Sequence, residues 1–180
     1  MIVTEFIVLA LALSTMNDSP NTKTPPVAPV HVSNTFHFLV HAPLHMAAPL
    51  FGPEGERGWA GDDWDPQFLY PQPAKDIPGA VFTIQRGQQK SVWITTQFDL
   101  DKGRMQYVSV VPGIKASTVD VTLTAVDDST TSVEVTYIRT ALDAAANEEV
   151  QALGRSDLEE GPHWQEAIDT YLKEQRNKTH

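Results

Sequence analysis

An acidic cluster surrounds two tryptophans within residues 54–71. The cluster consists of Glu54, Glu56, Asp62, Asp63 and Asp65, with Trp59 and Trp64 among them. Paired carboxylates perform general acid–base chemistry when burial drives their pKa values apart. They also bind hard cations, but the alternating ligand spacing of a calcium loop is absent. We favour the simpler interpretation, a solvated loop with turn-forming aspartates. An ion pair between Glu56 and Arg57 beside Trp59, capping the mouth of a cavity, is the structural alternative.

Four histidines, His31, His37, His41 and His45, recur at spacings of six, four and four residues. Histidines four apart on a helix can share a metal ion. Here the surrounding pattern predicts a strand that ends at Pro43, which would separate His37 from His41 by about 13 Å. We therefore expect no metal site and interpret these histidines as solvated or edge residues.

Aromatic residues and one arginine are the candidates for a ligand site. The residues expected to line a cavity or its mouth are Trp59, Trp64, Trp93, Tyr107, Tyr137, Arg139 and Trp164. The planar guanidinium of Arg139 would suit a ligand carboxylate, although we favour a position at the sheet edge with its head group in water. The sequence has no Gly-rich phosphate loop, nucleophile elbow or zinc motif. It therefore assigns no catalytic residue, cofactor or metal.

Composition narrows the function classes. The chain has 180 residues, 41% of them hydrophobic and 20% charged, which is typical of one soluble globular domain. A formal charge of −10 disfavours nucleic acid and anionic membrane surfaces as partners. We expect a monomer or small homo-oligomer. Because cysteine is absent, disulfides and thiolate catalysis are excluded.

Residues 1–30 are interpreted as an N-terminal apolar segment followed by a proline-rich tether. The apolar run at residues 6–13 is too short to span a membrane. It fits a secretory signal over residues 1–16, or upstream sequence if translation begins at Met16. We favour a cytoplasmic location, with export as the alternative. A single domain is expected over residues 31–176.

Hydrophobic periodicity predicts the elements of that domain. A strand over 32–40 precedes two short helical turns over 44–51, interrupted by Pro49. Breakers then delimit six antiparallel strands at 68–70, 80–86, 92–100, 104–111, 116–126 and 132–141. The last two alternate apolar and polar residues, so one sheet face should be covered.

The C-terminal region predicts that cover. Its apolar residues follow helical spacing, at Trp164, Ala167, Ile168, Tyr171 and Leu172. Gly161-Pro162 marks the start of this helix. A second, short helix is expected between Asp143 and Glu160.

This order of elements resembles the helix-grip fold of the START-like, or SRPBCC, superfamily. Local motifs are similar to those of a bacterial subgroup, namely Gly55-Glu56-Arg57 with Trp59, Trp64-Asp65-Pro66 and Leu69-Tyr70-Pro71, followed by Gly79-Ala80-Val81-Phe82, Val92-Trp93, Thr136-Tyr137 and Thr140-Ala141-Leu142. The resemblance covers residues 31–174 and departs at Asp63, where a glycine is expected. It implies an α+β fold in which about seven curved antiparallel strands grip a long C-terminal helix around a cavity.

Three functions follow from this resemblance, whose members include polyketide cyclases, lipid-transfer domains and co-chaperones. The first, which we favour, is noncatalytic binding of a small hydrophobic or amphipathic molecule between sheet and helix. The second is a cyclase- or dehydratase-like enzyme with a general acid or base in the cavity. The third is a co-chaperone-like interaction module. Because the superfamily has no shared catalytic set, its fold cannot choose among them.

Overall fold

The computed structural model describes residues 27–178. Its strands are β1 (His31–Val40), β2 (Gln67–Tyr70), β3 (Val81–Arg86), β4 (Gln89–Asp99), β5 (Arg104–Val111), β6 (Lys115–Asp127) and β7 (Thr130–Ala141). Its helices are α1 (Leu44–Ala47), η1 (Ala48–Phe51), α2 (Pro53–Glu56), η2 (Ala144–Ala146), α3 (Asn147–Asp157) and α4 (Glu160–Lys178). The apolar run at 6–13 and the alternative start at Met16 lie outside the described residues.

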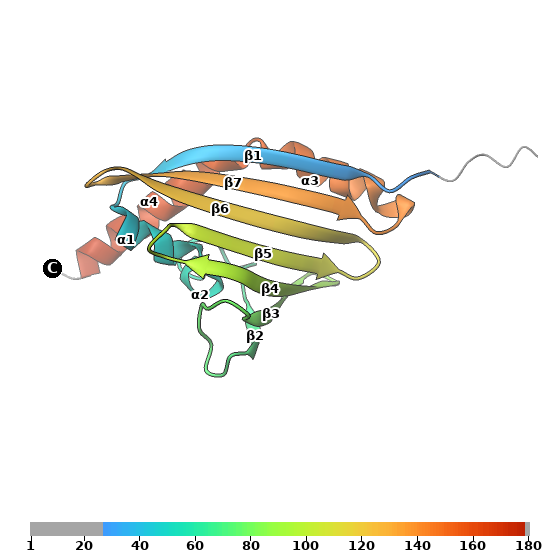
Figure 1. Ribbon diagram of the computed structural model, residues 1–180, viewed down its shortest axis with the longest axis horizontal. Coiled ribbons are helices and arrows are strands. Elements are labelled where there is room, and N and C mark those ends of the chain that lie inside the picture. Colours follow the sequence, from blue (N-terminus) through green and yellow to red (C-terminus); the bar gives the residue numbers. More distant parts are fainter. Residues whose placement is uncertain (1–26, 179–180) are drawn as a thin grey trace, which may run out of the picture.

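All seven strands form one antiparallel sheet in the order β1-β7-β6-β5-β4-β3-β2. Short hairpins join β3 through β7, and β1 closes the arrangement by pairing with β7. The sheet is curved, and α3 and α4 lie behind it in Figure 1. This is the helix-grip architecture that the sequence predicts.

One turn shows why the sheet keeps its register. Gly103, between β4 and β5, has a φ of 59°, which suits glycine. A Cβ added there would lie 2.5 Å from the Leu123 carbonyl oxygen on β6. The predicted glycine turn is therefore confirmed, and it also needs glycine for close packing.

The core occupies the concave face of the sheet. Met105, Val121, Val135 and Phe36 form one cross-strand row, and all four are buried. From α4, Ile168 and Leu172 are buried in the same cluster, which Trp164 and Tyr171 flank. The predicted amphipathic helix is therefore confirmed, and the short helix before it is α3.

The segment after β1 differs in detail from the prediction. Helices α1 and η1 supply the two expected turns, with Pro49 in the first turn of η1. A third turn, α2, begins just before the segment 54–71 and extends into it, where the sequence predicts a loop. Pro53 explains its start, because proline is tolerated in the first turn of a helix.

The histidines occupy separate surroundings. Strand β1 ends at Val40, so His41 lies beyond it and its ring contacts Asp169 at 2.6 Å. His37 lies 3.7 Å from Glu134, and both side chains are exposed. Within residues 27–178, no group of three or more acidic or histidine side chains is arranged to hold a metal ion.

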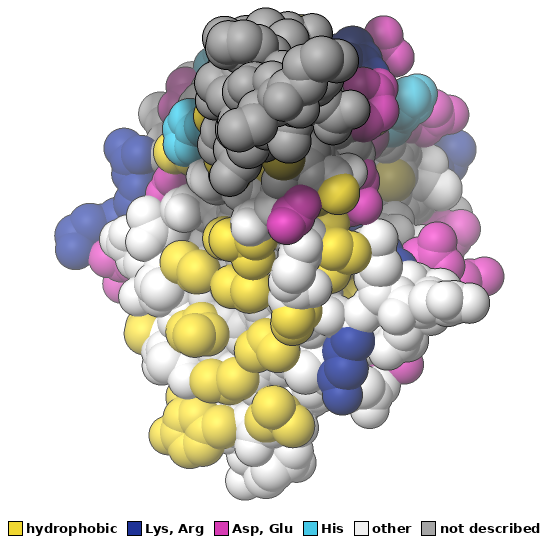
Figure 2. All heavy atoms as spheres, turned by 90° about the vertical axis from the view of Figure 1, so that its right-hand side faces the viewer, with side chains coloured by type: hydrophobic (Ala, Val, Ile, Leu, Met, Phe, Trp, Pro, Cys, Tyr) yellow, Lys and Arg dark blue, Asp and Glu magenta, His cyan; other side chains and the backbone are white. Residues whose placement is uncertain are grey.

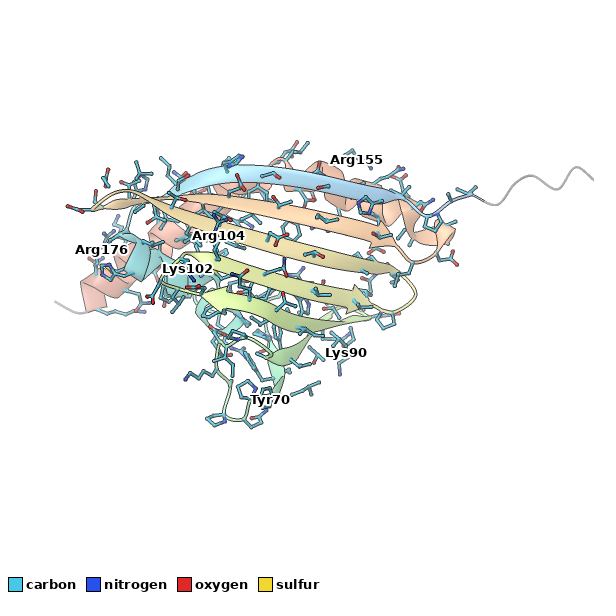
Figure 3. All side chains as sticks on the ribbon, viewed as in Figure 1. Tyr70, Lys90, Lys102, Arg104, Arg155 and Arg176 are labelled. Atoms are coloured by element: carbon cyan, nitrogen blue, oxygen red, sulfur yellow. The ribbon has the colours of Figure 1, made fainter. Side chains whose placement is uncertain are left out.

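The surface carries dispersed basic residues. Lys90, Lys102, Arg104, Arg155 and Arg176 are spread around the molecule in Figure 3 rather than gathered on one face. Apolar side chains do gather on one end of the molecule (Figure 2). Among residues 27–178, no helix has both the length and the apolar character needed to cross a membrane.

Candidate functional site

A cavity of about 410 Å³ lies between the concave face of the sheet, residues 53–64 and helices α3 and α4. Residues 53–64, which begin with α2, are called the α2 segment below. Its wall includes all seven residues selected from the sequence: Trp59, Trp64, Trp93, Tyr107, Tyr137, Arg139 and Trp164. It also includes Glu56, which the favoured sequence interpretation placed in a solvated loop, and four residues not considered for a site: Arg86, Asp157, Glu160 and His163.

The two tryptophans of the α2 segment pack in different directions. Trp59 meets Trp164 of α4 edge-on, with ring centroids 5.2 Å apart. Trp64 instead meets Trp93 of β4 at 5.8 Å. Their indole N–H groups donate to the backbone carbonyls of Leu50 and Pro53, respectively. The segment therefore closes the cavity against both the helix and the sheet.

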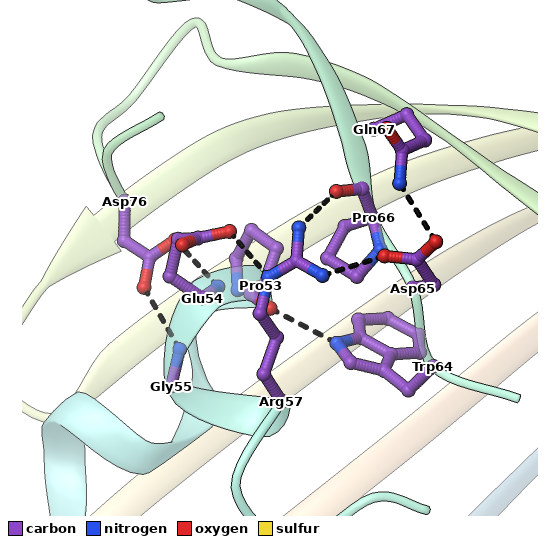
Figure 4. Close-up of polar contacts among 9 residues, drawn as sticks. All are labelled: Pro53, Glu54, Gly55, Arg57, Trp64, Asp65, Pro66, Gln67 and Asp76. Carbon is purple, nitrogen blue, oxygen red and sulfur yellow. Dashed lines mark hydrogen bonds and ion pairs between the residues drawn. The ribbon is translucent and has the colours of Figure 1, made fainter. Parts of the chain in front are cut away.

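Arg57 stabilises this closure without contacting Glu56. Its guanidinium donates to Glu54 at 2.8 Å and Asp65 at 2.7 Å, and also to the Pro66 carbonyl (Figure 4). The Arg57 hydrogen bond lowers the pKa of Asp65. The expected Glu56–Arg57 pair is therefore wrong, because consecutive residues on a helix face different directions. The other two loop aspartates are exposed.

Asp76 holds α2 in position. Its carboxylate accepts hydrogen bonds from the backbone N–H groups of Glu54, at 3.0 Å, and Gly55, at 3.3 Å (Figure 4). A Cβ on Gly52 would meet the same carboxylate at 2.2 Å. Burial raises the pKa of Asp76, while these two backbone bonds oppose the rise. This anchoring sets the direction in which Glu56 points.

Glu56 is the member of the acidic cluster that lines the cavity, whereas the favoured sequence interpretation placed it in a solvated loop. Its carboxyl lines the cavity and forms no hydrogen bond or ion pair with any residue in the range 27–178. Burial raises its pKa well above the ordinary value, with a further rise from Asp76 and an opposing effect from Arg86. A buried carboxyl with a raised pKa is suited to proton transfer or to pairing with a ligand cation.

The two tyrosines differ in how free their hydroxyl groups are. Tyr107 donates to the Phe51 carbonyl oxygen at 2.5 Å, which ties β5 to the short helices. The Tyr137 hydroxyl has no hydrogen-bond partner among the described residues. Burial raises the pKa of both phenols, so both stay neutral. Of these two tyrosines, therefore, only Tyr137 offers its hydroxyl group to a ligand.

Arg139 is buried rather than placed at a sheet edge, so the favoured sequence interpretation is wrong. It is only 8% exposed, because β7 is an interior strand covered by α3. Its guanidinium pairs with Asp157, which is 3% exposed, and lies 4.0 Å from the Tyr137 ring centroid. The positive charge of Arg139 is therefore neutralised within the protein.

The cavity is polar toward one end. A cross-strand row joins Trp93, Ser109, Ser117 and Arg139, and both serines are buried. An adjoining chamber of about 140 Å³ includes these residues and Lys115, which pairs with Glu149. A bound molecule would thus meet aromatic rings at one part of the wall and hydroxyl groups at another.

The cavity opens toward solvent where exposed residues line it. These residues are Arg86, Ser156 and His163. The Arg86 guanidinium carbon lies 6.0 Å from the Trp64 ring centroid, and Arg86 forms no ion pair within the described chain. An exposed cation without an ion-pair partner among the described residues therefore lies at the opening.

Solved structures share this architecture. A putative uncharacterized protein from Rhizobium leguminosarum has a TM-score of 0.58 at 15% identity, covering 82% of this chain and 97% of that one. Norcoclaurine synthase from Thalictrum flavum, in complex with dopamine and hydroxybenzaldehyde, has a TM-score of 0.56 at 10% identity, covering 96% and 98%. Ara h 8.0201 has a TM-score of 0.54 at 12% identity, covering 81% and 99%.

These similarities establish the helix-grip fold. No protein-family model matches the sequence, and no curated protein does. At identities this low, the fold is shared but the site chemistry must be argued from the residues of this chain.

Proposed function

We propose that this protein binds a small amphipathic molecule, largely hydrophobic, between the sheet and α4. The observation that carries the proposal is the cavity of about 410 Å³, whose wall contains seven aromatic side chains. Its volume falls within the usual range for small-molecule sites, which are mostly apolar with a few polar groups. Here those polar groups include Glu56, Tyr137 and the serine row.

Two variants that add the same ring at different places test this proposal. Ala167 of α4 lines the cavity, whereas Ala152 of α3 is exposed and does not. Ala167→Phe should fill the cavity and weaken binding of the neutral dye N-phenylnaphthylamine at least about tenfold. Ala152→Phe is the matched control and should bind like the unmodified protein.

The measurement is dye fluorescence, together with native mass spectrometry of gently purified protein. A ligand that co-purifies with the protein and with Ala152→Phe, but not with Ala167→Phe, would support the proposal. Equal binding by both variants would place the dye elsewhere and count against it.

A second candidate function is a cyclase- or dehydratase-like enzyme that uses Glu56 as general acid or base. The unpaired carboxyl and its raised pKa favour this candidate. The fold houses at least one synthase, so it does not exclude catalysis. Any ligand recovered by mass spectrometry should be incubated with the protein and with Glu56→Gln. Conversion by the protein alone, with binding retained in both, would establish catalysis.

A further inference from the structure

Aromatic rings are prominent in the cavity wall, and the polar groups of several of them are already occupied. The indole N–H groups of Trp59, Trp64 and Trp93 all donate to protein acceptors, and so does the Tyr107 hydroxyl. These groups are consequently unavailable to a ligand. These side chains instead present the π-electron faces of their rings to the cavity, and such faces attract positive charge.

Glu56 lines the cavity together with these rings and has no partner among the described residues. It comes from α2, and its charge acts on both Tyr107 and Tyr137. A partly buried carboxylate without a partner loses part of its hydration, and a cation within contact distance would offset that loss. Rings and carboxylate together form the kind of cage that recognises organic ammonium groups.

We propose that the ligand carries an organic ammonium group, which sits among the cavity rings against Glu56, on an apolar body that fills the rest of the cavity. This inference rests on the proposed function and names the chemical class of its ligand. The protein already places one cation near these rings, since Arg86 lies over Trp64.

The other charges around Glu56 are compatible with this assignment. Asp76, behind α2, adds negative potential, while Arg86 on β3 adds positive potential. The charge of Arg139 on β7 is neutralised by Asp157 of α3. From α4, Glu160 and His163 line the same cavity, and the phenols of Tyr107 and Tyr137 are neutral. The chain's formal charge of −10 would also draw cations toward the opening.

Binding of an ammonium group should release a proton over a limited range of pH. Because the pKa of Glu56 is raised in the free protein, Glu56 is protonated there below that pKa. A cation favours the ionised carboxylate and lowers the pKa again. Proton release should therefore occur between the pKa of Glu56 in the complex and its pKa in the free protein, and vanish above the latter.

Three probes of similar shape but different charge test the inference on the full chain. They are phenyltrimethylammonium, tert-butylbenzene and benzenesulfonate, each a phenyl ring bearing a tetrahedral group. The cation should bind at least about tenfold more tightly than the neutral and anionic probes, measured by tryptophan fluorescence and by shifts of the indole N–H resonances. Calorimetry in buffers of different ionisation enthalpy would count the released protons.

Glu56→Gln is the decisive variant, because it keeps the size of the side chain and removes its charge. It should abolish the preference for the cation and the proton release, while leaving binding of tert-butylbenzene unchanged. Glu134→Gln, at an exposed position on β7, is the control with the same change in net charge and should behave like the unmodified protein.

The outcomes separate the two proposals. Equal or tighter binding of tert-butylbenzene or benzenesulfonate would overturn the ammonium assignment while supporting a hydrophobic site, with benzenesulfonate pointing to Arg86 instead. Failure of all three probes and of the neutral dye would overturn both proposals. A cation preference that survives in Glu56→Gln would also overturn the inference, because the charge of Glu56 would not be its cause.

Discussion

At the residue scale, the least expected feature is a carboxyl group held in an aromatic cavity without a partner. Glu56 is held there because Asp76 anchors α2 and because Arg57 turns outward to Glu54 and Asp65. Arg139 is the opposite case, because its charge is tolerated in the interior by pairing with Asp157. One ionisable group in the cavity wall thus has a partner within the chain, and Glu56 has none among the described residues.

Removing the charge of Glu56 should change the pH dependence of stability. A carboxyl whose pKa is raised by folding contributes stability below its unfolded pKa, and that contribution is lost as the pH rises through the folded value. Glu56→Gln should therefore be more stable than the unmodified protein above the folded pKa of Glu56, and show no comparable gain at pH near 4.

Urea denaturation across this pH range measures the difference. A variant that is equally destabilised at every pH would show that Glu56 contributes through packing or a hydrogen bond, and that its pKa is not raised in the folded protein.

Breaking the Arg139–Asp157 pair should be strongly destabilising. Asp157→Ala leaves the guanidinium buried and unpaired, which typically costs about 3–5 kcal/mol. The double variant Arg139→Met with Asp157→Leu should be much less destabilised, because no charge remains buried. Chemical denaturation compares the two. If the double variant were as unstable as the single one, loss of packing rather than of charge pairing would be responsible.

At the element scale, the α2 segment joins three parts of the fold. Trp59 meets α4, Trp64 meets β4, and Asp76 holds the helical turn from behind. The segment is therefore a structural closure of the cavity, as its two tryptophans suggest from the sequence alone.

Trp64→Ala should lower the free energy of unfolding by about 3 kcal/mol, within the range for truncation of large aromatic side chains. Trp64→Phe should lose less, because it keeps a ring against Trp93 and gives up the indole bond to Pro53. Thermal denaturation and dye binding should be measured together. An unchanged melting temperature with abolished binding would show that the segment is a working lid instead.

Local sequence patterns predicted the helices and strands well. They did not predict which side chains from different elements contact one another. Strands β6 and β7 and helix α4 repeat their burial pattern over many residues, so periodicity defines both type and inward face. A helical turn of four residues, such as α2, is too short for any period, so the direction of Glu56 had no local signal. Asp157 likewise meets Arg139 only through the packing of α3 on β7, which sequence spacing does not encode.

At the whole-molecule scale, the fold is supported by similarity to solved structures, whereas the function is argued from the residues of this chain. The seven-stranded sheet and C-terminal helix are shared with structures of 10–15% identity, among them a synthase. The domain limits of 31–176, the oligomeric state and the co-chaperone-like alternative stay predictions. The apolar end face in Figure 2 is where an interaction with another protein would first be sought.

The net charge makes a prediction for the entire molecule. With a formal charge of −10, the folded chain repels itself, and salt screens that repulsion. Moving from low to near-physiological sodium chloride should raise the melting temperature by a few degrees. A fall in melting temperature with salt would show that ion pairs such as Lys115–Glu149 outweigh the repulsion.

The pairing of β1 with β7 has a consequence for how the protein is made. His31 lies opposite Thr140. The residues of β1 at this end can therefore pair with β7 only after more than a hundred further residues have been synthesised. Helix α4, which completes the cavity, emerges later still. Because α4 follows all other described elements, the cavity forms only near the end of synthesis. Contacts this distant in sequence also form slowly. Any ligand that the cavity binds would therefore act on the stability of the folded protein rather than on its early folding.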